Sequence, residues 1–192
     1  MGYSRLNFSH AAFCLLALLF PLHLNAQKPA RHLEIDRTKP LDVKFIADAT
    51  FGKIEGMTTA LTGMFNAVET DTGLIGDFQF EVALDSIDTG IGLRNKHMRE
   101  YLETTLFPSA GYRGKIVAML QNNDAAKTEG GFTVHGVTKL FTASGRMIKT
   151  DTGYRVHASF PLNFKDFGIV KPRFLIATVD EELKIEVDFY LK

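Results

Sequence analysis

Hydrophobic and polar residues alternate along most of the chain from residue 41 onward. The clearest run is "GDFQFEVALDSI" (76–87), where apolar side chains occupy every second position: Phe78, Phe80, Val82 and Leu84. The residues between them include Gln79 and Glu81, so one face is apolar and the other polar. Strict alternation over this length predicts an antiparallel strand that is buried on one face.

Further segments with the same two-residue period follow one another along the chain, separated by Gly-containing polar turns. They are 42–56, 61–73, 111–120, 130–147, 153–169 and 181–192. About eight strands within one chain of this length predict an all-β fold, an eight-stranded antiparallel barrel. The interior of such a barrel is filled by its own side chains or holds one small ligand.

The spacing of the apolar residues changes in the middle of the chain. Met98, Tyr101, Leu102 and Leu106 recur at three- and four-residue steps, which predicts one apolar face of a short helical insert over about 92–106. Asp88 or Thr89 is expected to cap its start and Pro108 to end it. The insert is expected to line or close one end of the barrel.

The first 26 residues have the pattern of a cleaved signal peptide. Arg5 precedes an apolar stretch, Ala11 to Leu24, and cleavage is expected after Ala26. A retained membrane anchor is the alternative. Residues 27–40, which contain two prolines, are expected to form an extended lead-in, and 41–192 a single barrel domain. We therefore expect an exported protein.

Composition removes several classes of function. The chain has 22 basic and 22 acidic residues, so nucleic-acid binding has no electrostatic support. Its one cysteine, Cys14, lies in the predicted signal peptide, which leaves no disulfide or thiolate site. His97, His135 and His157 stand apart without a metal-binding motif, and no G-x-S-x-G occurs. Neither a metal nor catalysis is expected. The 16 phenylalanines instead suggest a wide apolar interior.

A set of motifs occurs in a fixed order. They are "SIDTG" (86–90), "RNKHMR" (94–99), "LFP" (106–108), "FTVHGVTK" (132–139), "DFGI" (166–169) and "VDEELKIEVDF" (179–189). Together they resemble the YceI-like family of exported polyisoprenoid-binding proteins. The family pattern near the helix usually reads Arg-Asp-x-His-Leu-Arg. Arg94, His97 and Arg99 match it, whereas Asn95 and Met98 replace the Asp and the Leu.

The resemblance implies a lipocalin-like barrel of eight antiparallel strands, with a long apolar pocket for an isoprenoid or similar lipid and a periplasmic location. It implies no enzymatic reaction and no cofactor; the ligand would be an isoprenoid, quinone-like or fatty-acid-like lipid. The protein would act as a carrier, store or scavenger, with membrane contact for lipid exchange. Whether it forms a homodimer is left open.

Candidate chain-binding residues are the inward apolar side chains. They are Phe45, Phe65, Phe78, Phe80, Val82, Leu84, Met98, Leu102, Phe132, Phe160, Leu162 and Ile185. The alternative is that they fill a solid core, in which case the barrel would be a stress-response or protein-interaction module.

Candidate contacts to a polar head group are Arg94, His97, Arg99, His135 and Thr138, because Arg and His donors suit anionic oxygens. The alternative is that the arginines pair with acidic neighbours and that His135 holds a turn beside Gly136.

Overall fold

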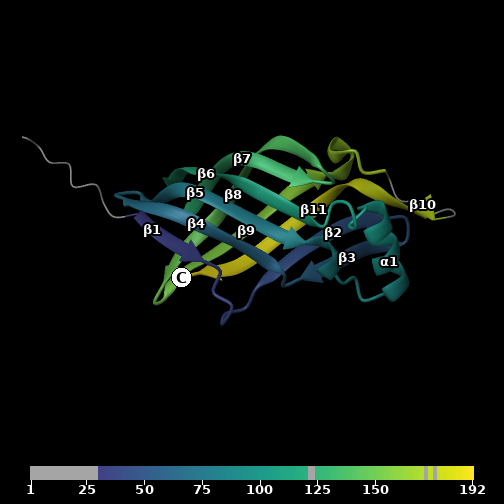
Figure 1. The fold of residues 1–192 in the computed structure, drawn as a ribbon, viewed down its shortest axis with the longest axis horizontal. Coiled ribbons are helices and arrows are strands. Elements are labelled where there is room, and N and C mark those ends of the chain that lie inside the picture. The colour runs from purple at the N-terminus through teal and green to yellow at the C-terminus, as the bar shows by residue number, and fades with distance from the viewer. Residues whose placement is uncertain (1–29, 121–123, 171–172, 175–176) are drawn as a thin grey trace, which may run out of the picture.

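The structure is a computed structural model that describes residues 30–120, 124–170, 173–174 and 177–192 (Figure 1). The predicted signal peptide lies outside these residues. The described part contains eleven strands and one α-helix, α1 (Gly92–Tyr101). It also has two 3-10 helices, η1 (Leu84–Ser86) and η2 (Phe164–Phe167). The strands are β1 (Ala30–Glu34), β2 (Asp42–Ala49), β3 (Gly52–Thr58), β4 (Leu61–Thr70), β5 (Gly73–Ala83), β6 (Ser109–Leu120), β7 (Ala125–Val134), β8 (Val137–Thr150), β9 (Gly153–Asn163), β10 (Arg173–Phe174) and β11 (Ala177–Leu191).

All the strand pairs are antiparallel, in the order β1-β4-β5-β6-β7-β8-β9-β11-β2-β3, with β10 paired to β11. The sheet curls until the chain after β1 reaches the end of β11. There Ile35 bridges Leu191, and the amide of Asp36 donates to the carbonyl of Tyr190 at 2.8 Å. The result is an antiparallel β-barrel that is closed where β1 meets β11, which confirms the predicted fold class.

The strand count exceeds the predicted eight for local reasons. Residues 42–56 form a hairpin, β2 and β3, instead of one strand, because the chain reverses at Thr50–Phe51 and enters β3 through Gly52 at φ +114°. Within the expected lead-in, Ala30–Glu34 form β1, which pairs with β4. Residues 130–147 also contain a hairpin, whose two-residue turn is His135–Gly136.

The helical insert is shorter than predicted. α1 ends at Tyr101, and Glu103 takes a positive φ of +47° in the following turn. Leu106 therefore leaves the helix face and is 70% exposed. The expected cap at Asp88 or Thr89 was also wrong: Gly90, at φ +77°, turns the chain first, and Ile91 precedes the helix without a side-chain cap.

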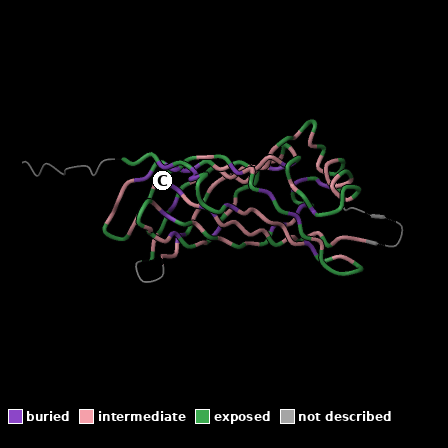
Figure 2. Tube along the Cα trace, turned by 90° about the horizontal axis from the view of Figure 1, so that it is seen from below, coloured by how far each residue is buried: buried purple, intermediate pink, exposed green. Residues whose placement is uncertain are grey.

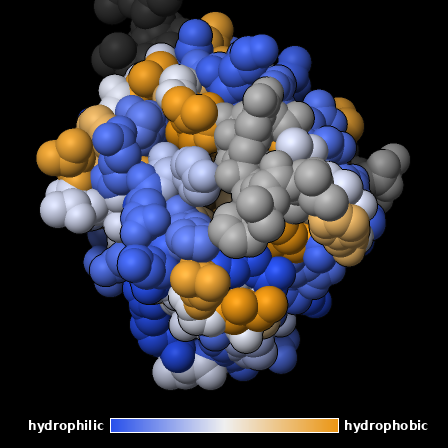
Figure 3. All heavy atoms as spheres, turned by 90° about the vertical axis from the view of Figure 1, so that its right-hand side faces the viewer, coloured by the Kyte–Doolittle hydropathy of each residue, from blue (hydrophilic) through white to orange (hydrophobic). Residues whose placement is uncertain are grey.

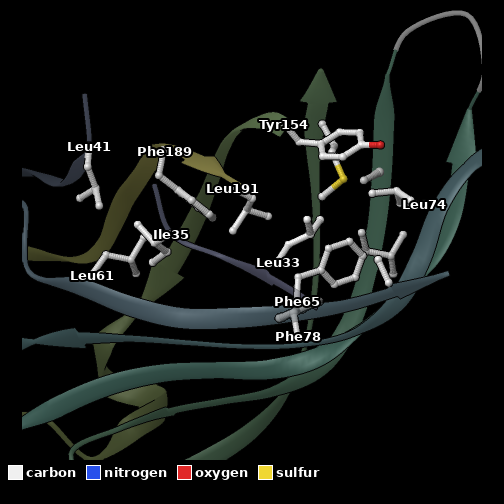
Figure 4. Close-up of a cluster of buried hydrophobic side chains, with 14 residues drawn as sticks. Leu33, Ile35, Leu41, Leu61, Phe65, Leu74, Phe78, Tyr154, Phe189 and Leu191 are labelled. Carbon is white, nitrogen blue, oxygen red and sulfur yellow. The ribbon is translucent and has the colours of Figure 1, made fainter. Parts of the chain in front are cut away.

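Buried side chains gather in two clusters. The larger lies at the end of the barrel where β1 meets β11, which we call the closed end. There Leu33 and Ile35 of the N-terminal segment meet Phe189 and Leu191 of β11 (Figure 4). Along the strands, burial changes over short stretches, as expected for one inward and one outward face (Figure 2). The smaller cluster lies around η2, where Phe167 is only 2% exposed. The closed end is thus a packed core, and it leaves the other half of the barrel for the site.

Candidate functional site: an apolar cavity open at one end

The barrel interior contains a cavity of about 1050 Å³. Its floor includes Phe65 and Phe78, which also belong to the packed cluster of the closed end. From there it extends toward α1 and the β2–β3 hairpin. The volume lies at the upper end of ligand pockets, about 300–1,000 Å³. It is about seven times the ~150 Å³ apolar cavity that admits benzene. A ligand of several tens of non-hydrogen atoms fits such a space.

The structure brings all twelve predicted chain-binding residues to the cavity wall. They are Phe45, Phe65, Phe78, Phe80, Val82, Leu84, Met98, Leu102, Phe132, Phe160, Leu162 and Ile185. The predicted inward faces of the strands are therefore confirmed. That these side chains contact a lipid stays a prediction.

Several inward aromatic rings are only partly buried. Phe80, Phe132 and Phe160 all face the cavity and all retain some accessible surface. Phe132 and Phe160 meet edge to face with centroids 6.4 Å apart. A solid core would have closed over these rings. The interior of this barrel is hollow, which argues against the alternative of a filled core.

The mouth of the cavity lies between α1 and the β2–β3 turn. We define it by four lining residues that are also exposed: Phe51 (75%), Ile91 (51%), Leu93 (60%) and Tyr101 (37%). Figure 3 views the molecule from its α1 end, where hydrophobic residues stand among hydrophilic ones. An apolar ligand that enters here would meet apolar side chains from the surface inward.

One hydroxyl in the wall is already satisfied by the protein. The Tyr112 hydroxyl donates to the carbonyl of Phe141 at 3.1 Å and lies 3.0 Å from the Thr128 hydroxyl, which donates to the Ala143 carbonyl at 3.0 Å. Burial raises the pKa of Tyr112 above its usual value, so this side chain stays neutral at physiological pH. Its ring therefore serves as wall, and its hydroxyl holds β6 to the neighbouring strands.

The five head-group candidates fall into two groups in the structure, those that line the cavity and those that do not. Arg94 and His97, one turn of α1 apart, line the cavity. Arg99, His135 and Thr138 do not. Arg99 Nη1 reaches the carbonyl of Asp85 at 3.5 Å, and Thr138 Oγ1 lies 2.8 Å from the hydroxyl of Thr133.

His135 instead connects the β7–β8 turn to neighbouring segments of the chain. Its Nε2 lies 2.6 Å from Glu103 Oε2, and its Nδ1 lies 3.3 Å from the carbonyl of Phe167. The Phe107 ring packs edge to face on the imidazole at 4.7 Å. These contacts match the alternative role for His135, that of fixing a turn.

The segment before α1 is held by a side chain inside the helix. Asn95 Oδ1 accepts hydrogen bonds from the amide of Thr89 at 2.8 Å and from its hydroxyl at 2.6 Å. Asn95 Nδ2 donates to Asp88 Oδ1 at 2.7 Å. The hydrogen bonds from Asn95 and from the amide of Gly90 lower the pKa of Asp88 below its usual value. This network fixes the carbonyl of Thr89, to which Arg94 Nη2 donates at 2.5 Å.

Sequence reasoning missed part of the wall. Tyr112 could have been found, because counting back from the apolar Ile116 in steps of two places it on the inward face of β6. The mouth residues Phe51, Ile91 and Leu93 had no such signal, since they lie in a turn and at a helix start. Only the tertiary arrangement brings the two segments to one opening.

The described residues hold no group of three His, Cys, Asp or Glu side chains close enough to share a metal ion. None of their helices has the length and hydropathy that a membrane span requires.

A hollow antiparallel β-barrel with an apolar cavity and an apolar mouth defines the class of β-barrel binding proteins. The YceI-like domain matches residues 34–191 of this chain. The protein belongs to the YceI-like domain family, as the ordered motifs predicted.

Similar proteins include a UPF0312 protein of Pseudomonas aeruginosa (strain LESB58), 34% identical over 93 residues, which are 44% of this chain and 48% of that protein. A UPF0312 protein of Pseudomonas paraeruginosa is 33% identical over the same length. The chain spans about half the length of the curated relatives it matches.

Solved structures with this fold include BcnA of Burkholderia cenocepacia, with a TM-score of 0.70, 14% identity and coverage of 81% of this chain and 98% of that chain. A polyisoprenoid-binding domain from Saccharophagus degradans, implicated in plant cell wall breakdown, has a TM-score of 0.65 at 16% identity, covering 83% and 97%. The Campylobacter jejuni YceI protein has a TM-score of 0.56 at 16% identity, covering 71% and 84%. At these identities the likeness shows the fold.

Proposed function

We propose that the protein binds a polyisoprenoid or similar long-chain lipid inside the barrel, without catalysis, and serves as its carrier, store or scavenger. The observation that carries the proposal is the cavity of about 1050 Å³ with its predominantly apolar wall. The polyisoprenoid-binding domain of similar fold supports a ligand of this kind. The proposed place of action is the periplasm, on the grounds of the signal-like residues 1–26.

Burial of apolar surface is the driving force for such binding. Each Å² of lipid surface removed from water contributes about 25 cal/mol. Burial of a long prenyl chain therefore contributes several kcal/mol to the free energy of binding. This is what remains after subtracting the entropy lost when the chain and the partly exposed rings become ordered. Because most of the wall is formed by apolar side chains, the shape and length of the chain would select the apolar part of the ligand.

A matched pair of tryptophan variants tests the proposal. The protein contains no tryptophan. Val82 faces the cavity and its neighbour Glu81 is exposed on the outer face of β5. Val82→Trp adds volume inside the cavity, whereas Glu81→Trp adds the same indole outside. Binding of geranylgeraniol is measured by displacement of the neutral fluorescent probe N-phenylnaphthylamine.

We expect wild type and Glu81→Trp to bind geranylgeraniol equally and Val82→Trp to bind at least about tenfold more weakly, since the indole takes the place of several ligand carbons. Indole emission should shift on ligand addition only in Val82→Trp. A wild-type protein that binds neither probe nor geranylgeraniol would overturn the proposal, as would equal affinities in the two variants.

We further propose that the mouth touches a membrane surface when lipid is exchanged. Phe51, Ile91 and Leu93 are exposed and continuous with the cavity wall, so a chain that leaves a bilayer could pass along them without crossing water. Lys44 and Lys53 also border the cavity and suit an anionic surface.

Vesicles of phosphatidylethanolamine and phosphatidylglycerol test the membrane contact in a co-sedimentation assay. Phe51→Ser should weaken association about tenfold, since burying a Phe contributes about 1.5–3 kcal/mol. Leu140 is the control, because it is 88% exposed but does not line the cavity. An equal effect of Leu140→Ser, or no effect of Phe51→Ser, would contradict the assignment of the mouth as the contact.

A further inference from the structure

Arg94 places a partly desolvated cation in the cavity wall. It is the third residue of α1 and lines the cavity. Nη2 donates to the carbonyl of Thr89 at 2.5 Å. Nε is buried and is the one buried side-chain nitrogen or oxygen without a hydrogen-bond partner in the described part of the chain. Removing part of a guanidinium from water costs free energy when one of its donors has no partner. A nearby negative charge that accepts a hydrogen bond offsets this cost.

The protein does not supply that compensation. Across the described ranges no carboxylate lies within ion-pair distance of Arg94. The nearest acidic residue in sequence, Asp88, accepts from Asn95 and from the amide of Gly90 instead. Lys96, on the same helix, has its partner in Glu100 at 3.8 Å. Arg99 likewise has no carboxylate within ion-pair distance in the described ranges, and its Nη1 donates to the carbonyl of Asp85 at 3.5 Å. Because Arg99 does not line the cavity, only Arg94 of the two arginines can offer its charge to a bound ligand.

Most of the other ionisable groups around the cavity are basic. Those that can be positive are Lys44, Lys53, Arg94, His97 and Arg146, and the one acidic residue is Glu100. Glu100 lies six residues from Arg94 on α1, about 9 Å along the helix axis, and faces Lys96. Lys53 and Arg146 have acidic partners, in Asp48 at 3.9 Å and Asp124 at 3.7 Å. An anionic group of a ligand would therefore be attracted chiefly by Arg94.

We propose that the ligand is a long-chain amphiphile with an anionic headgroup, a carboxylate in the simplest case, whose oxygens bind the Arg94 guanidinium while its chain fills the cavity. This inference rests on the proposed lipid-binding function and deepens it. The bound carboxylate supplies the counter-charge that the protein lacks, and a guanidinium forms its strongest hydrogen bonds with such a group. The position of Arg94 beside Ile91 and Leu93 sets the orientation: headgroup at the mouth, chain toward Phe65.

A pair of ligands that differ only in the headgroup tests the proposal on the unaltered protein. Geranylgeranoic acid and geranylgeraniol have the same chain, and each is titrated by displacement of N-phenylnaphthylamine at neutral pH. We expect the acid to bind at least about tenfold more tightly than the alcohol, because hydrogen bonds to charged groups are stronger than neutral ones. This comparison requires no variant and so does not depend on whether one folds.

Three variants locate the effect. Arg94→Gln should bring the two affinities to within about threefold of each other, and Arg94→Lys should retain part of the preference for the acid because it retains the charge. Arg99→Gln is the matched control: Arg99 lies on the same helix, does not line the cavity and should leave the preference unchanged. Thermal unfolding of each variant checks that it is folded.

The outcomes separate this inference from the function on which it rests. Equal binding of acid and alcohol by the wild-type protein would overturn the headgroup assignment while leaving the lipid cavity in place. Failure of both ligands to bind would overturn the lipid-binding function and the assignment together. Equal loss of preference in Arg94→Gln and Arg99→Gln would show a general charge effect and would also overturn the role of Arg94.

Discussion

The side-chain amide of Asn95 donates to the carboxylate of Asp88 at 2.7 Å, so a residue of α1 holds the segment that precedes the helix. The same side chain accepts two hydrogen bonds from Thr89 through its oxygen. The YceI-like pattern has Asp at this position. The structure shows that Asn95 bonds Asp88 and Thr89 and that Arg94 bonds the carbonyl of Thr89. The Asn95 amide can therefore donate to Asp88, whereas an Asp at this position would place two carboxylates side by side, and they would repel each other.

Asn95→Asp should lower the Tm by several degrees at neutral pH. It removes the donor to Asp88 and places two carboxylates in contact, whereas the acceptor for Thr89 is retained. Because repulsion raises the pKa of one of the two carboxylates above its usual value of about 4, the repulsive part of the loss should shrink as pH falls through that raised pKa and should be absent below about pH 4. Thermal unfolding at several pH values measures this. Asn95→Ala removes the hydrogen bond that lowers the pKa of Asp88 but adds no charge, so its difference from wild type should narrow only below about pH 4.

Asp36 and Lys192 join the chain just after β1 to the last residue, with Nζ 2.7 Å from Oδ1. The hydrogen bonds from Lys192 and then from Thr38 lower the pKa of Asp36 to about 2. Because this pKa lies below that of an unfolded Asp, the contribution to stability is present above about pH 4 and is lost as pH falls through 2.

Asp36→Asn should therefore lower the Tm by several degrees at pH 6, with a difference from wild type that narrows progressively between about pH 4 and pH 2. Differential scanning calorimetry across this range gives the comparison. A difference that stays constant down to pH 2 would mean that the charge of Asp36 does not contribute.

Large-to-small substitutions should distinguish the packed end from the hollow end. Leu191 is 1% exposed in the core of the closed end, and Leu191→Ala should reduce the free energy of unfolding by about 2–5 kcal/mol. Phe160 is a larger side chain, but it faces the cavity and is only partly buried, so Phe160→Ala should cost less than about 2 kcal/mol. Urea denaturation of both variants provides the test, and a larger loss for Phe160→Ala would contradict a hollow interior.

Gly136 should not tolerate a side chain. Its φ of +71° is the left-handed conformation, and a methyl group there would come 2.6 Å from the Phe107 ring. Gly136→Ala should destabilise the protein by at least about 1–2 kcal/mol. Gly111→Ala serves as control because its nearest contact would be 3.4 Å and its φ is not in that region. Denaturation midpoints of the two variants should differ clearly.

The strand faces were predictable because side chains in a strand alternate with a fixed period of two. Val82 and Ile185 needed only that rule to be placed on the cavity wall, and they lie there. The end of α1 was not predictable in the same way. Leu106 continues the helical spacing, but the turn at Glu103 ends the helix early, because the chain there must reach β6 and the His135 turn.

The amino-acid sequence by itself determined the class of fold, the inward apolar faces and the membership of the YceI-like family, since these depend on local periodicity and on ordered motifs. Only the tertiary structure decided whether the barrel was hollow. The sequence pattern places a phenylalanine such as Phe132 on the inward face in both cases. Only the structure shows that a cavity remains beside it and that the ring is only partly buried. Helical spacing alone places Arg94 and Arg99 about 140° apart around α1, and only the tertiary structure decided which of them faces the cavity.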